Sequence, residues 1–139
     1  DISLDVAASL HLDAVRISRT PLFTAFAGMG QLIGRLGLFT LSELSLWKAK
    51  RRHFRVPDHF EGIVAGEAVH EGHFLHILKD LRPGTTEVMM HPGTDNEKLI
   101  PACDWEHDFE AEMQAIVSPK VRRMIADKAV KVVNYRDLK

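Results

Sequence analysis

A histidine followed by proline and glycine, His91-Pro92-Gly93, is the combination with the clearest chemical potential in this sequence. It follows an apolar run, residues 85–90, whose length and composition predict a buried strand. The Pro-Gly pair ends that strand and starts a turn. Ligand sites of β/α proteins lie at the carboxyl ends of their strands, so we expect His91 to point into a site and to exchange protons there.

The surroundings of His91 in the sequence restrict its chemistry. The alternative reading is a histidine that only ends its strand and hydrogen-bonds to backbone, and the residues alone leave both readings open. Asp95 lies four residues later and could orient or charge the imidazole. No Gly-x-Ser-x-Gly segment occurs, and no serine or cysteine lies beside His91, so the sequence gives little support to nucleophilic catalysis.

Two further motifs favour ordinary structural explanations. His70, His73 and His76 lack the metalloprotease spacing, and on a helix they fan apart by about 60° each, which favours surface histidines over a two-histidine metal contact. The run 28–34 is similar to a dinucleotide loop with one residue too many. Close helix packing explains its glycines better, and a nucleotide-binding domain stays a third, weaker possibility.

Composition bounds the class of protein. The 139 residues suffice for one domain with a core, and the net charge of -1 gives no basic field for nucleic acid. Cys103 is the only cysteine, which excludes an internal disulfide and fits a reduced, cytoplasmic setting. The apolar segment 21–41 is interrupted by Gln31 and Arg35, so it favours a buried helix over a membrane span.

The elements that must position His91 follow from hydrophobic periodicity. The order of expected helices and strands indicates an α/β protein with parallel strands. Three strands are few for such a chain, so we expect the later part of a larger β/α domain. Strands are expected at 14–18, 85–90 and 130–135, and a polar loop at 94–98. Helices are expected at 2–12, 23–36, 41–51 and 70–81. Two more helices should begin at Asp104, with Trp105, Phe109, Met113 and Ile116 buried, and at Ser118-Pro119.

Four segments together resemble the C-terminal part of the YdjC-like carbohydrate deacetylases, the family that includes chitooligosaccharide deacetylase. The most specific is 84–93, followed by Asp95, which resembles the family's Pro-Gly-x-x-Glu-[apolar]-x-x-His-Pro-Gly segment. Residues 14–19 resemble its strand end, although Ser18 replaces the usual proline and Thr20 a common acidic residue. The other two segments are 58–63 with Gly66, similar to the Phe-x-Gly segment, and 132–138, similar to the closing strand.

The resemblance implies a fold and a set of site residues. Residues 1–139 would be the C-terminal portion of a β/α barrel with parallel strands and extra helices, within one deacetylase domain. The family's metal-binding N-terminal half, with its Asp-Asp and His-x-Asp-Ser-His segments, is absent from this chain. A divalent metal, magnesium or zinc, would therefore have its ligands outside the chain, and none within it. His91 would be catalytic, and Asp95, Arg16, Phe60 and Gly62 would support it or contact substrate.

The implied function is removal of acetyl groups from N-acetylglucosamine-type oligosaccharides. A metal would polarise the acetyl carbonyl and activate water, while His91 would protonate the leaving amine or stabilise the tetrahedral intermediate. We expect an acetylated amino sugar as partner, neither nucleic acid nor membrane, an inactive isolated fragment, and self-association or pairing with the missing half through the truncated face. The alternative is a non-catalytic binding or regulatory domain that retains the end of the fold.

Overall fold

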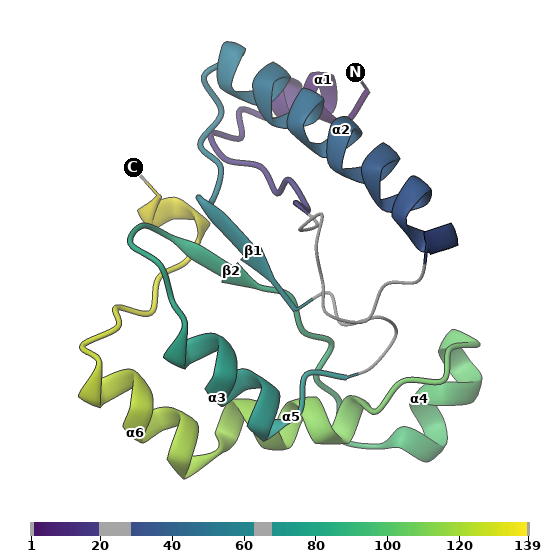
Figure 1. Ribbon diagram of the computed structural model, residues 1–139, viewed down its shortest axis with the longest axis vertical. Coiled ribbons are helices and arrows are strands. Elements are labelled where there is room, and N and C mark those ends of the chain that lie inside the picture. The colour runs from purple at the N-terminus through teal and green to yellow at the C-terminus, as the bar shows by residue number, and fades with distance from the viewer. Residues whose placement is uncertain (1, 20–28, 63–67, 139) are drawn as a thin grey trace. The chain divides into compact units, whose positions relative to one another are not determined.

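The computed structural model describes residues 2–19, 29–62 and 68–138 (Figure 1). These residues contain six α-helices, two short strands and a 3₁₀-helix, which confirms the α/β class. No closed barrel is seen among them, so the barrel stays a prediction. In chain order the elements are α1 (Ile2–Ser9), α2 (Met29–Arg51), β1 (His59–Glu61), α3 (Glu71–Lys79), β2 (Thr86–Val88), α4 (Asn96–Cys103), α5 (Phe109–Val117), α6 (Pro119–Asp127) and η1 (Tyr135–Asp137).

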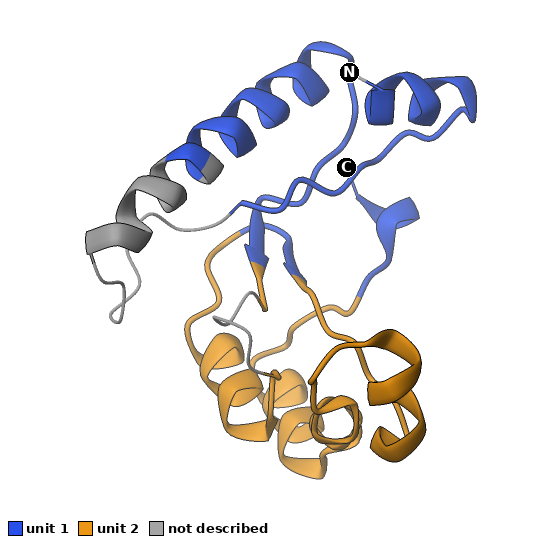
Figure 2. Cartoon of the chain, turned by 90° about the vertical axis from the view of Figure 1, so that its right-hand side faces the viewer, with its two compact units in different colours: residues 1–60, 84–87, 133–139 blue, residues 61–83, 88–132 orange. Residues whose placement is uncertain are grey.

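The two strands form a parallel sheet. The His59 N–H donates to the Thr85 carbonyl and the Met89 N–H donates to the Glu61 carbonyl, both at 2.9 Å. The strand expected at 85–90 is thus confirmed in its central part, where β2 lies. As Figure 2 shows, the chain divides into two compact units: unit 1 comprises residues 1–60, 84–87 and 133–139, and unit 2 comprises residues 61–83 and 88–132.

Unit 1 is built around α1 and the C-terminal end of α2. Its buried residues are Leu4, Ala7, Ala49 and Phe54, and Val15, Ile17 and Val56 pack against them. Backbone hydrogen bonds tie the segment after α1 to the segment after α2, because the Val15 N–H donates to the Arg55 carbonyl at 2.9 Å. Burial of these apolar side chains is the main force that holds α1 on α2.

Unit 2 contains α3, α4, α5 and α6. The Ser118 hydroxyl oxygen accepts from the Lys120 and Val121 N–H groups and so caps α6, as Ser118-Pro119 predicted. The same hydroxyl donates to the Glu71 carboxylate at 2.6 Å, and the Lys120 ammonium lies 2.8 Å from Glu71. These bonds join the start of α3 to the junction of α5 and α6 and fix the frame that carries the site.

The expected strands at 14–18 and 130–135 are wrong. In the first segment only Ala14 forms a β-bridge, with Arg55. The second has no regular structure before η1, and Val132 is 76% exposed, so its apolar residues have no sheet to pack against. Asn134 instead forms a capping box with Asp137 at the start of η1.

Three helix predictions also need correction. The break expected at Gly37 does not occur, since α2 continues through this residue. A glycine inside a helix costs about 1 kcal/mol of stability relative to alanine, and the helix forms in spite of it. The predicted start of that first helix lies outside the described residues. The polar loop at 94–98 is instead the beginning of α4, and Asp104, expected to cap the next helix, ends α4 in the left-handed conformation with φ 48°.

Over the part of the chain that the structure describes, no helix has both the length and the apolarity that a bilayer span requires.

Candidate functional site

The His-Pro-Gly turn brings His91 against the beginning of α5. The Gly93 N–H donates to the Phe109 carbonyl at 2.9 Å. A Cβ atom at Gly93 would approach the Phe109 Cβ to 2.9 Å and would also overlap the Leu99 side chain. Only glycine therefore allows the chain to pass this closely, and this contact places His91 in unit 2 beside the residues that precede α5.

A buried carboxylate holds the backbone of His91 in place. Glu112 lies on α5 with a side chain 2% exposed. One of its oxygens accepts the Val69 N–H at 2.9 Å, and the other accepts a short hydrogen bond from the His91 N–H. Two charge-assisted bonds of this kind offset part of the cost of burying the charge, so the position of His91 depends on Glu112.

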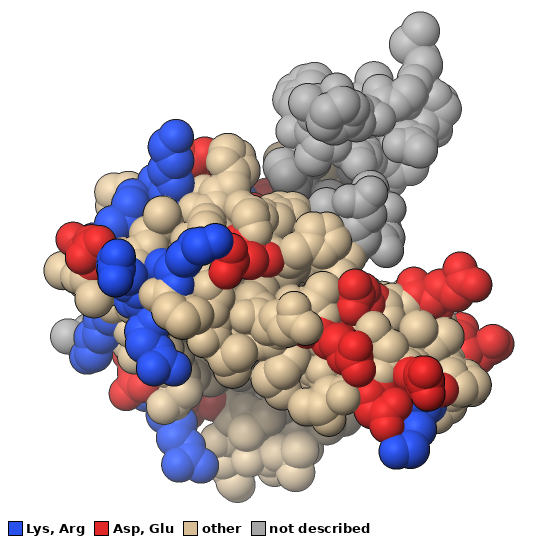
Figure 3. Space-filling model, turned by 90° about the horizontal axis from the view of Figure 1, so that it is seen from below, with Lys and Arg blue, Asp and Glu red and all other residues tan. Residues whose placement is uncertain are grey.

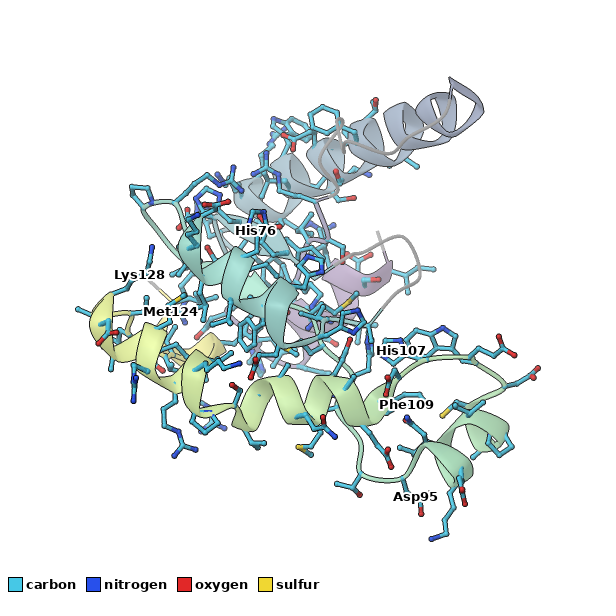
Figure 4. The ribbon with its side chains drawn as sticks, turned by 60° about the horizontal axis from the view of Figure 1, so that its bottom comes forward. His76, Asp95, His107, Phe109, Met124 and Lys128 are labelled. Carbon is cyan, nitrogen blue, oxygen red and sulfur yellow. The ribbon has the colours of Figure 1, made fainter. Side chains whose placement is uncertain are left out.

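A second buried histidine completes the group. The His107 side chain is 3% exposed, and its Nε2 lies 3.2 Å from Glu112 Oε1. Neither ring nitrogen has a hydrogen-bond partner among the described residues. The ring is stacked on Trp105 at 4.1 Å between centroids and meets the His91 ring edge-on at 5.4 Å. Figure 4 shows His107 just before α5, with Phe109 next to it.

His91, His107 and Glu112 could exchange protons or hold a cation. One ligand atom of each lies within 4.8 Å of the others. His91 is half-buried whereas the other two are buried, so the group reaches solvent on the His91 side. We call these three residues the His91 cluster. Acidic side chains gather over the end of unit 2 that contains α4 (Figure 3). A cation therefore meets a favourable field near this end.

Asp95, the predicted partner of His91, lies at the start of α4. Its carboxylate accepts the Lys98 N–H at 3.0 Å and pairs with the Lys98 ammonium at 2.7 Å. The side-chain bond from Lys98 and then the backbone bond lower the pKa of Asp95. Asp95 therefore caps a helix, and in Figure 4 it lies at α4, apart from His107. An effect of Asp95 on the imidazole of His91 stays a prediction.

Arg16 and Phe60 lie in unit 1 and interact with each other. The Arg16 guanidinium carbon is 5.9 Å from the Phe60 ring centroid, and its Nε donates to Glu87 at 2.6 Å. The Tyr135 hydroxyl donates to the other Glu87 oxygen. Burial first, and then this bond, raise the pKa of Tyr135 to about 12. Arg16 thus neutralises a carboxylate within the unit, and a contact with substrate stays a prediction for both residues.

The backbone conformation at position 62 explains why this residue is glycine. Its φ of 96° lies in the left-handed region, and a Cβ atom there would come within 2.9 Å of the Met89 nitrogen. The close approach of two backbones next to the sheet therefore requires glycine at this position.

The three histidines of the α3 segment take no part in the His91 cluster. His76 is 72% exposed and lies 3.5 Å from Asp80, and the His70 side chain, at the cap position of α3, makes no capping hydrogen bond. His107 and Glu112 were not predicted as site residues from the sequence. The missed signal was spacing: Phe109, Glu112 and Ala115 recur every three residues and are the buried positions of α5, so a glutamate stands in the middle of an apolar face.

Comparison with known proteins identifies the family. The family described as YdjC-like protein matches residues 1–127. A carbohydrate deacetylase from Thermoanaerobacter pseudethanolicus is 29% identical over 82 residues, which cover 59% of this chain and 33% of the relative. No solved structure matches the chain at a significant level. Because the family match covers most of the chain, the protein belongs to the YdjC-like family.

Proposed function

We propose that this chain contributes to a carbohydrate deacetylase in which His91 donates a proton to the amine that leaves an N-acetylated sugar. The observation that carries the proposal is the half-buried side of the cluster that His91 forms, on a backbone held by the buried carboxylate of Glu112. The similar carbohydrate deacetylase supports the reaction class. The chain spans about a third of that relative's length, so the activity is proposed for a protein that contains this chain.

The chemistry requires a proton at the leaving nitrogen. Hydrolysis of an acetamido group adds water to the acetyl carbon and expels an amine, which leaves poorly unless nitrogen is protonated. Imidazole exchanges protons near neutral pH, so His91 can donate the proton and later recover it from solvent. Glu112 acts through the His91 backbone and is a positioning residue.

The divalent metal that the family suggests does not fit the His91 cluster as a catalytic metal. A cation bound to the imidazole of His91 would occupy the nitrogen that must carry the proton. One histidine cannot perform both tasks in the same turnover, so we assign the ligands of a catalytic metal to residues outside this chain. The steps assigned to this chain are therefore proton transfer and positioning.

The experiment measures acetate release from chitooligosaccharides by a purified protein that contains this sequence together with a family N-terminal half. We expect His91→Ala to lower the rate by about 10²–10⁴-fold, the usual contribution of a positioned general acid. The matched control is His76→Ala, which removes an exposed imidazole of the same unit. Melting temperature is recorded for all three proteins.

Two outcomes would contradict the proposal. Near-normal turnover of a folded His91→Ala protein would show that His91 is not the acid. Binding of chitooligosaccharides without any acetate release by the unchanged protein would favour the alternative, a binding or regulatory domain that retains the end of the fold.

A further inference from the structure

We infer that the His91 cluster is a binding site for a zinc-type divalent cation, distinct from a catalytic metal, and that a cation bound there withholds His91 from proton transfer. Two imidazoles and one carboxylate form the ligand set that zinc uses when a fourth position stays open to water. All three side chains belong to unit 2.

The spacing of the ligand atoms is close to what zinc needs. Bonds of about 2.0–2.1 Å in tetrahedral geometry place two ligand atoms about 3.3 Å apart. His107 Nε2 and Glu112 Oε1 are already 3.2 Å apart. All three ligand atoms lie within 4.8 Å of one another, so the remaining closure is small. His91, the half-buried member, is the side chain that can move to complete it.

The second observation is the state of the His107 nitrogens. Both are buried and neither has a hydrogen-bond partner among the described residues. A buried polar atom without a hydrogen-bond partner destabilises a folded protein, and each such exception calls for a specific explanation. A cation at Nε2 supplies one, because it gives this nitrogen a ligand bond and offsets the charge of Glu112.

The choice of cation follows from the donors and their surroundings. Imidazole suits zinc, whereas magnesium prefers six oxygen ligands in octahedral geometry. The segment that carries His107 is acidic, since Asp104, Glu106 and Asp108 lie within three residues of it and are exposed. These carboxylates raise the local concentration of cations without entering the cluster.

The test is titration of this chain with zinc chloride by calorimetry, with magnesium chloride as the comparison. We expect one zinc per chain and no heat from equimolar magnesium. His91→Ala and His107→Phe should each weaken zinc binding by more than the roughly 10–100-fold that loss of an outer-shell partner costs. The phenylalanine keeps a ring that can stack on Trp105, which limits the loss of packing.

His76→Ala is the matched control and should leave zinc affinity unchanged. Circular dichroism verifies that each variant is folded, and zinc should raise the melting temperature of the unchanged chain but not of His91→Ala. Absence of stoichiometric binding would overturn the inference. Equal affinity in folded His107→Phe would do so too, as would a loss of binding confined to His76→Ala.

The effect on turnover rests on the proposed function, whereas binding does not. In the protein that releases acetate, zinc added beyond the catalytic metal should inhibit at the concentration at which calorimetry shows binding. Inhibition without binding at the His91 cluster would overturn the regulatory part. An inactive protein that still binds zinc through these residues would refute the proposed deacetylase alone.

Discussion

Each of the two units encloses a carboxylate, and the two carboxylates differ in what surrounds them. In unit 1, Glu87 is paired with the Arg16 guanidinium and accepts the Tyr135 hydroxyl, and its side chain is 11% exposed. In unit 2, Glu112 is 2% exposed, and its bonds come from two backbone N–H groups. The imidazole of His107, next to Glu112, makes no hydrogen bond to any residue that the structure describes, so unit 2 keeps a buried polar group without a hydrogen-bond partner among them.

This difference concerns what each cluster can still bind. A carboxylate that a guanidinium and a hydroxyl saturate has little capacity left for a ligand. The carboxylate of Glu112 instead holds backbone N–H groups, and neither nitrogen of the neighbouring His107 ring has a hydrogen-bond partner in the part of the chain that the structure describes, so the imidazole can still take a proton or a cation. The comparison therefore predicts that unit 1 responds to mutation through stability alone, and that unit 2 responds through stability and binding.

The largest effect on stability is expected from Glu112→Ala. The change leaves the N–H groups of Val69, which is fully buried, and of His91 without an acceptor. Removal of one member of such a buried charged group costs about 3–5 kcal/mol of unfolding free energy. Urea unfolding followed by Trp105 fluorescence in a Trp47→Phe background measures it within unit 2. Exposed Glu106→Ala is the control, and a loss below about 1 kcal/mol would contradict the buried role.

Glu87→Ala should cost less, about 1–2 kcal/mol. The Arg16 side chain is 49% exposed, so water can hydrate its charge when Glu87 is removed. The ion pair therefore contributes less to stability than a fully buried pair would. The same unfolding experiment, read through Trp47 in a Trp105→Phe background, measures unit 1. A destabilisation equal to that of Glu112→Ala would break the comparison between the two carboxylates.

The ionisation of Tyr135 provides a pH test of unit 1. Tyr135 is the single tyrosine, so ultraviolet difference absorbance follows its phenolate alone. We expect a midpoint at about 12 in the folded chain and near 10.0 in denaturant. The folded state then holds a proton that the unfolded state releases, so stability falls as the pH rises from 10 towards 12. In Glu87→Ala the midpoint should move down, and an unchanged midpoint would exclude Glu87 as a cause.

Asp95→Ala should have the smallest effect on stability, and it tests whether the zinc site extends beyond the His91 cluster to α4. Loss of the cap of α4 should destabilise the chain only slightly, because the Asp95 side chain is exposed to solvent. The pKa of Asp95 is lowered by its bonds to Lys98, so its contribution to stability is present above pH 3.8, the ordinary pKa of an aspartate, and is lost as the pH falls through the folded pKa. Zinc affinity should not change, because Asp95 is not among the three residues of the His91 cluster. A weaker zinc affinity would extend the site to α4.

The sequence was informative where local chemistry decides the structure. Ser118-Pro119 starts a helix because the hydroxyl and the fixed proline φ act within one turn. The run before His91 forms β2 because apolar residues next to a Pro-Gly stop have few alternatives. Both predictions depend on contacts between neighbours in the chain.

The His91 cluster could not be predicted because contacts between distant segments assemble it. The helix was expected to begin after Asp104 and to bury Trp105, Phe109, Met113 and Ile116. The helix α5 instead begins at Phe109, and its buried residues are Phe109, Glu112 and Ala115. That start depends on the approach of Gly93 to Phe109, which no local pattern encodes. The strand predicted at 130–135 does not form, because its apolar residues have no neighbouring strand to pair with among the described residues.

The chain passes between the two units four times, because unit 1 is assembled from three separate stretches and unit 2 from two. Arg16 meets Glu87 across 71 positions and Arg55 meets the Leu138 carbonyl across 83, so loops of most of the chain must close before unit 1 is complete. Folding rates fall as such separations grow, because closure entropy is lost before the contacts form. Unit 1 is therefore complete only when residues 133–138 have joined it, although its core residues, from Leu4 to Phe54, all lie in the first stretch of the chain.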